Sequence, residues 1–273
     1  MSRNTSSSGP STFDDPSAAR RVYEAISEEG RRELDRPNKS LFWSGIIAGA
    51  LMSLSLLTSA LIWRVAEGHP ASDLLVALGY PAGFLLVMLG HMQLFTENTI
   101  TTVLPVLDER SFACVRRSAL LWAIVLGANL LGAAAVSAAW VAGMLPESLQ
   151  PAVISVAEKG TSGTFAECFA HAIPAGFIIA VLVWVTRRER QKVLIITFFT
   201  WLIAACHFKH VIVGAVEWFF LLWTKGASAL SLGWTFFIPA LLGNVVGGTL
   251  LFAFMAWAQV RKENEEAESA QSA

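Results

Sequence analysis

A polar decapeptide, residues 90–99 (GHMQLFTENT), interrupts an apolar stretch that begins near Leu74 and resumes from Ile100 to Leu107. The chain is 54% apolar and only 15% charged, against roughly 25% charged in soluble domains, which predicts an integral membrane protein. In a bilayer every backbone N–H and C=O must be satisfied by the protein, so irregular backbone survives only against protein or a wet cavity. The decapeptide therefore predicts a broken helix that lines a pathway. A polar kink facing a neighbouring helix is the structural alternative.

A second polar cluster, Cys206-His207-Phe208-Lys209-His210, interrupts a later apolar run. An internal repeat relates the two clusters: residues 244–248 (NVVGG) resemble residues 129–133 (NLLGA), an offset of 244 − 129 = 115. The same offset carries Phe95 onto His210. Interrupted apolar segments at matching positions of two repeats are a sequence indication of a transport site. The repeat also predicts four packing positions: Asn129, Gly132, Asn244 and Gly247.

Six membrane-spanning segments of about 20 residues or more are expected. The second and fifth contain the breaks, so the predicted fold is an all-α membrane protein with six helices in an inverted three-plus-three repeat. We expect a cytoplasmic N-terminal segment over 1–40 (disordered to about residue 15, then a short amphipathic helix before Gly30), a transmembrane domain over 41–260 and a cytoplasmic tail over 261–273. The predicted spans are 41–63, 76–107, 118–144, 165–186, 193–223 and 235–259.

Lysine and arginine residues fall mainly on one side of these spans. Sixteen of the twenty belong to the N-terminal segment, the 108–117 and 187–192 loops and the tail, whereas the opposite loops hold three and Lys209 lies within a span. Because positively charged loops stay in the cytoplasm, both termini are predicted to be cytoplasmic.

Composition also indicates which other classes to set aside. The formal net charge of −1 suggests no nucleic-acid partner. The three cysteines, Cys114, Cys168 and Cys206, have no CxxC spacing, so neither a zinc site nor a disulfide framework is indicated. We expect no metal, no cofactor and no enzyme activity.

The segments QLFTENT (93–99), TVLPV (102–106), HVIVGAVE (210–217) and GNVVGG (243–248) resemble the formate/nitrite transporter family, and within it the YfdC-like branch. The resemblance covers roughly residues 40–260. It implies an aquaporin-like protomer with one pore, assembled as a homopentamer in the bacterial inner membrane. The substrates it implies are small monovalent anions of weak acids, of the formate, nitrite or hydrosulfide type.

The family's site residues can be placed position by position. His210 matches the central pore histidine, with Thr96 as its partner, and Leu94 and Phe95 match the apolar constriction of the loop. The remaining matches are Tyr80, Phe84 and Ile203 at the cytoplasmic slit, Ile179 at the periplasmic slit, and Lys159 near the vestibule lysine.

The chain departs from the family at several of these places. Glu97 replaces a small hydroxyl residue, Lys209 replaces an acid, His207 is an additional imidazole, and Gly176 stands where formate channels carry asparagine. Buried membrane charges are usually paired, so a Glu97–Lys209 ion pair is predicted, with either a structural or a selectivity role.

These features predict a channel in which His210 assists the passage of a weak-acid anion. A bare anion is costly to bury, and histidine, whose unperturbed pKa is about 6.5, can supply a proton near neutral pH. One alternative is a neutral-solute pore of aquaporin type, although no Asn-Pro-Ala motif is present. Another is a membrane metalloenzyme that uses His207 and His210 with Glu97.

Overall fold

A computed structural model describes residues 18–271, and all regular structure in this range is helical. The disorder predicted for residues 1–15 lies outside the described residues. The α-helices are α1 (Ala18–Asp35), α2 (Asn38–Leu51), α3 (Ser53–Ala66), α4 (Ser72–Ala77), α5 (Pro81–Leu89), α6 (Phe95–Thr101), α7 (Val103–Glu109), α8 (Phe112–Ala139), α9 (Gln150–Thr161), α10 (Phe165–Thr186), α11 (Lys192–Ala205), α12 (Val211–Lys225), α13 (Ile238–Val245) and α14 (Phe254–Gln271). Short 3₁₀ and π-helical turns join them: η1 (Trp140–Met144), η2 (Glu147–Leu149), η3 (Gly226–Ala229), η4 (Gly233–Phe237) and η5 (Val246–Ala253).

Five helical segments in the described range are long and apolar enough to cross a membrane. The predicted second span is divided among α4 to α7, and α4 and α5 together form one of the five segments. The predicted fifth span is divided into α11 and α12, and each of these two helices is too short to be counted as a membrane-crossing segment. The five long segments are Asn38–Ala66, Ser72–Leu89, Phe112–Met144, Phe165–Thr186 and Gly233–Glu263.

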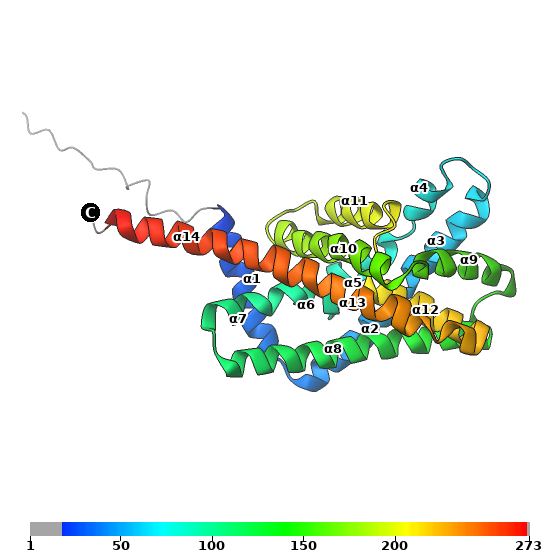
Figure 1. Cartoon of the computed structure of the whole chain (residues 1–273), viewed down its shortest axis with the longest axis horizontal. Helices are drawn as coiled ribbons and strands as arrows, with labels where there is room; N and C mark the ends of the chain where they lie inside the picture. The colour runs from blue at the N-terminus through cyan, green and yellow to red at the C-terminus, as the bar shows by residue number, and fades with distance from the viewer. Residues whose placement is uncertain (1–17, 272–273) are drawn as a thin grey trace, which may run out of the picture.

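The long helices α8 and α14 run along the long axis of the molecule, and each end of this axis has its own elements (Figure 1). Helix α1 and the far end of α14 lie at one end, which we call the α1 end, whereas α4 and α9 lie at the other. The 187–192 loop belongs to the α1 end, because Arg187 forms an ion pair with Glu29 of α1. The basic segments predicted to share one side of the membrane therefore do share one end of the molecule.

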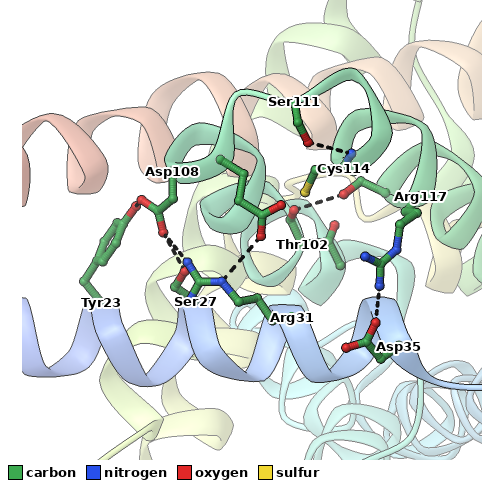
Figure 2. A network of polar contacts seen from close by, with 11 residues as sticks. Tyr23, Ser27, Arg31, Asp35, Thr102, Asp108, Ser111, Cys114 and Arg117 are labelled. Atoms are coloured by element: carbon green, nitrogen blue, oxygen red, sulfur yellow. Dashed lines mark hydrogen bonds and ion pairs between the residues drawn. The ribbon is translucent and has the colours of Figure 1, made fainter.

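Helix α1 is longer than predicted: it continues through Gly30 to Asp35. A Cβ on Gly30 would lie 1.9 Å from the Thr101 carbonyl oxygen, so this glycine permits close contact with α6 rather than ending the helix. Asp108 binds the same helix, accepting hydrogen bonds from the Tyr23 hydroxyl at 2.5 Å and the Ser27 hydroxyl at 2.7 Å (Figure 2). Burial and the Asp108 carboxylate raise the pKa of Tyr23.

Two glycines of the internal repeat make equivalent helix contacts. A Cβ on Gly132 of α8 would lie 2.1 Å from the Ile46 carbonyl oxygen of α2, and one on Gly247 of η5 would lie 2.0 Å from the Ile173 carbonyl oxygen of α10. Small residues let membrane helices approach this closely. Neither Gly132 nor Gly247 therefore has room for a side chain at these helix contacts.

At the C-terminus, α14 runs without interruption past Arg261 to Gln271. The predicted tail therefore begins within a continuous helix.

Candidate functional site

The first polar decapeptide is a helix break. Helix α5 ends at Gly90, His91 takes a left-handed conformation with φ 51°, and Leu94 is extended (φ −104°, ψ 126°) before α6 begins. The second cluster has the same form: His207 has φ 55°, and His210 has φ −106° and ψ 124° before α12 begins. Both predicted breaks are present.

The matching backbone angles correct the predicted correspondence by one residue. His210 is the counterpart of Leu94, at an offset of 210 − 94 = 116, and Phe95 corresponds to Val211 rather than to His210. The 115-residue offset applies to Asn129 and Asn244, because the two halves differ by one residue between the break and the asparagine helix.

Each break is held by one buried asparagine. Asn129 accepts from the Phe95 N–H at 2.9 Å and donates to the carbonyl oxygens of Gln93 and Gly45, both at 2.8 Å. Asn244 repeats the pattern in the other half: it accepts from the Val211 N–H at 2.9 Å and donates to the carbonyl oxygens of Lys209 and Ala172, both at 2.8 Å. The asparagines thus satisfy backbone groups that the breaks expose, which a bilayer interior requires.

The two breaks meet at Thr96 and His210. The Oγ1 atom of Thr96 lies 2.9 Å from Nε2 of His210, and both residues are buried. The backbone N–H of Val213 approaches Nδ1 of His210 at 3.4 Å, so a neutral ring carries its proton on Nε2 and donates it to Thr96. The Phe84 ring meets the imidazole edge-on at a centroid distance of 4.9 Å.

A cavity with an empty volume of about 770 Å³ opens from His210 toward α4 and α9, and we call it the vestibule. Lys159 pairs there with Asp73, whose other oxygen lies 3.4 Å from Nε2 of His207. The Lys209 ammonium donates to the Gly160 carbonyl oxygen at 2.8 Å. The lining includes Trp63, Asp73, Tyr80, Lys159, His207, Lys209, His210 and Glu217.

A second cavity, with an empty volume of about 430 Å³, lies near the α1 end. Glu97 lines it, and its buried Oε1 atom accepts no hydrogen bond from the residues that the structure describes. Lys209 lines the vestibule instead, so the predicted Glu97–Lys209 ion pair is wrong. The two breaks turn these side chains toward different cavities. The lining of the second cavity is Glu29, Met88, Leu89, His91, Glu97, Val183, Thr186, Arg187, Lys192 and Ile196.

Apolar side chains fill the region between the two cavities. On one face of α5, Tyr80 lines the vestibule and Met88 lines the second cavity, while Phe84, one helical turn from each, is fully buried. Leu94, Ile179 and Ile203 are buried in the same cluster.

Two predicted constriction residues, Tyr80 and Ile179, lie toward the end of the molecule opposite to the one expected. Tyr80 faces the vestibule, at the end opposite α1, whereas it was predicted on the side of the N-terminal segment. Ile179 lies one turn before Val183, a residue of the second cavity, and therefore lies toward the α1 end rather than the opposite one. The Phe95 ring packs edge-on against Trp122 at 5.5 Å between centroids.

Sequence reasoning missed three polar residues of this region. Asp73 joins Lys159 and His207, Thr200 is buried on α11 at the counterpart position of Phe84, and Glu33 of α1 accepts from the Gln93 amide at 2.8 Å. The offset of 116 residues identifies Thr200 once the breaks are aligned. No local pattern indicates the other two, because their partners are distant in sequence.

The alternative of a metal pair at His207 and His210 does not fit the geometry. His207 turns to Asp73 and His210 to Thr96, so the two imidazoles do not converge. Over residues 18–271 there is no group of three or more His, Cys, Asp or Glu residues placed to hold a metal ion.

Two broken helices that meet at a buried histidine, within a bundle of apolar helices, define a membrane channel or transporter fold. The formate/nitrite transporter family model matches residues 20–258, and the chain belongs to this family. Inner membrane protein YfdC of Escherichia coli (strain K12) is 38% identical over 252 residues, which cover 91% of this chain and 81% of that protein. Uncharacterized transporter YrhG of Bacillus subtilis (strain 168) is 28% identical, with 90% of this chain and 95% of that protein covered.

Solved structures give the same fold. An FNT family ion channel superposes with a TM-score of 0.70 at 18% identity, covering 88% of this chain and 98% of that one. A pentameric formate channel with formate bound superposes with a TM-score of 0.63 at 19% identity, covering 89% of this chain and 98% of that one.

Proposed function

We propose that the chain is a channel for small monovalent anions of weak acids, of the formate, nitrite or hydrosulfide type, and that His210 assists their passage. The observation that carries the proposal is the Thr96–His210 contact at the inner end of the vestibule, next to a buried apolar cluster. An anion that reaches His210 has a polar partner there and mainly apolar side chains ahead of it.

The vestibule suits the entry of an anion. Lys159 and Lys209 place ammonium groups along its wall, and an ammonium group can donate hydrogen bonds to an anion. Asp73 and Glu217 share this wall, so they limit the attraction and favour singly charged substrates over strong polyanions.

The apolar cluster favours passage of the neutral acid. Moving a carboxylate into hydrocarbon without a partner is strongly unfavourable, and hydrophobic constrictions stop hydrated ions. Protonation of His210 from solution would give an imidazolium, which donates one proton to the weak-acid anion and returns to the neutral ring. The substrate would then enter the region around Phe84, Leu94 and Ile203 as the neutral acid, and it would release that proton on the far side.

The assembly and topology that we propose follow the same family. The solved relative with formate bound is described as pentameric, and we propose a homopentamer with one pore per protomer. The paired asparagine contacts support an inverted repeat of three plus three spans. We place the protein in the inner membrane with both termini in the cytoplasm, since the basic segments gather at the α1 end.

Initial flux into proteoliposomes tests the function. Formate, nitrite, hydrosulfide and acetate are compared between about pH 5 and 8 with chloride, the anion of a strong acid, and with glycerol as a neutral solute. We expect weak-acid flux to rise toward acidic pH and His210→Asn to lose that rise. Equal permeation of chloride or glycerol would contradict the proposal. An unchanged pH profile in His210→Asn would assign the proton to bulk water.

A further inference from the structure

A third cavity lies at the α1 end, between α1, α7 and α14. It has an empty volume of about 720 Å³, and its lining includes Tyr23, Leu107, Asp108, Arg110, Trp257 and Arg261. It shares no lining residue with the vestibule or with the second cavity described above. A role in the proposed pathway therefore does not account for it.

Two guanidinium groups converge on one indole in this cavity. The Cζ atoms of Arg110 and Arg261 lie 5.2 and 5.3 Å from the ring centroid of Trp257. Both arginines are exposed and Trp257 is half-buried. Contact with an aromatic face holds a guanidinium by cation–π attraction, and its planar fork matches the oxygens of a phosphate group.

The acid beside these arginines is directed elsewhere. The Asp108 carboxylate accepts from Tyr23, from Ser27 and, at 3.1 Å, from Arg31, all on α1 (Figure 2). Its oxygens are therefore engaged by α1, where Arg31 also forms an ion pair with Glu109 at 3.5 Å. Arg110 and Arg261 bring two guanidinium groups to the same wall as Trp257.

The backbone at Arg110 supports a use for its side chain. Arg110 ends α7 in the left-handed conformation, with φ 49° and ψ 30°. That conformation costs roughly 1–2 kcal/mol for a residue with a Cβ, and glycine or asparagine is the usual choice there. An arginine at this position places a guanidinium against Trp257 at some cost to the backbone.

The surroundings match the boundary between membrane and water. Trp257 lies near the end of the apolar segment Gly233–Glu263, where tryptophan anchors are common. Leu107 and Val260 give the cavity an apolar side, whereas Arg110 and Arg261 give it a basic one. Basic pockets of this kind at helix ends recognise phospholipid headgroups.

We propose that Arg110, Arg261 and Trp257 form a binding site for a phosphate group, as carried by the headgroup of an anionic phospholipid or by free phosphate. The site does not depend on the proposed transport function. Occupancy would tie α7 to α14 through a shared anion and so stabilise the α1 end.

The experiment uses the full-length protein purified in a neutral detergent. Binding of phosphatidylglycerol is measured by native mass spectrometry and by the shift in apparent Tm, with phosphatidylcholine as the neutral lipid and inorganic phosphate as the soluble anion. The test variant is R110Q/R261Q. The matched control is R116Q/R188Q, which removes two arginines from the same end but outside the cavity.

We expect phosphatidylglycerol to raise the apparent Tm of the wild type by about 2–4 °C and phosphatidylcholine to have a smaller effect. R110Q/R261Q should lose this shift and bind the anionic lipid about tenfold more weakly, while R116Q/R188Q keeps both. A comparable shift with inorganic phosphate alone supports the site and identifies free phosphate as sufficient.

Equal losses in the two double variants would reduce the effect to general charge attraction and overturn the proposal. Absence of a shift with both phosphatidylglycerol and phosphate would also overturn it. If R110Q/R261Q cannot be purified as a folded protein, R110Q and R261Q are tested singly, and each should weaken lipid binding. Weak-acid flux serves as the folding control, because the cavity is separate from the proposed pathway.

Discussion

The hydroxyl oxygen of Thr96 lies 2.9 Å from Nε2 of His210, although 114 residues separate them in the chain. Thr96 lies in the first turn of α6, directly after the first break, and His210 is the last residue before α12, at the end of the second break. The contact therefore requires both breaks to meet, and because the Val213 N–H is directed at Nδ1, the proton of a neutral ring lies on Nε2.

The first prediction concerns this contact. Thr96→Val keeps the shape of the side chain but removes the hydroxyl, leaving a buried N–H unsatisfied at a cost of about 1–3 kcal/mol. If that cost appears in the barrier to passage, formate flux should fall roughly tenfold to a hundredfold. Thr96→Ser, which retains the hydroxyl, should stay close to the wild type in the same proteoliposome assay. Equal rates for the two variants would contradict the role assigned to Thr96.

The second prediction concerns Asn244. Asn244→Ala leaves the N–H of Val211 and the carbonyl oxygens of Ala172 and Lys209 without their partner, so we expect a loss of several kcal/mol at about 1–3 kcal/mol for each buried group. Asn129→Ala should behave alike because it has the equivalent contacts. Ser228→Ala, at an exposed turn, is the control. Apparent Tm in detergent measures the effect. A fall in Tm no larger than that of the control would show that Asn244 does not hold the second break.

Gly176 gives a prediction about packing. A Cβ at this position would lie 2.2 Å from the Asn244 carbonyl oxygen, whereas one on the exposed Gly127 would meet nothing within 4 Å. Gly176→Ala should push α10 from α13 and destabilise the protein by about 1–3 kcal/mol. Gly127→Ala should be neutral or stabilising by up to about 1 kcal/mol, because alanine favours helix. Thermal unfolding of both variants tests this prediction. If Gly127→Ala were less stable than Gly176→Ala, the prediction would be wrong.

Glu97 and Lys209 give a prediction that differs from the one made from sequence. Because their side chains line separate cavities, the effects of Glu97→Gln and Lys209→Met on stability should add to within about 0.3–0.5 kcal/mol. A double-mutant cycle in detergent measures the coupling. A coupling energy above about 1 kcal/mol would show that they interact after all.

The Tyr23–Asp108 hydrogen bond leads to a pH-dependent prediction. The pKa of Tyr23 is raised in the folded protein, so its stabilising contribution is fully present below the unfolded value of about 10. It is lost as the pH rises above that value, because the unfolded chain ionises first. The difference in apparent Tm between the wild type and Tyr23→Phe should therefore shrink between about pH 9 and 11. A constant difference over this range would show that Tyr23 ionises equally in both states.

The sequence alone determined the membrane class, the positions of both breaks and the family. These follow from local rules: a run of apolar residues can only be a span, and a polar cluster within it must be shielded by protein. The family resemblance also predicted Thr96 as the partner of His210. The end of α1 was mispredicted at Gly30, because a glycine that ends an isolated helix can equally permit a close helix contact with Thr101.

Tertiary structure alone decided which side chains face each other across the breaks. At the breaks the offset between the two halves is 116 residues rather than 115, so Leu94 rather than Phe95 is the counterpart of His210. The structure also places the side chains of Glu97 and Lys209 in different cavities. It also brought Asp73 to Lys159 and Glu33 to Gln93. Side-chain direction in an irregular loop depends on each φ and ψ value, and these angles are set by distant partners such as Asn129 and Asn244 rather than by the local sequence.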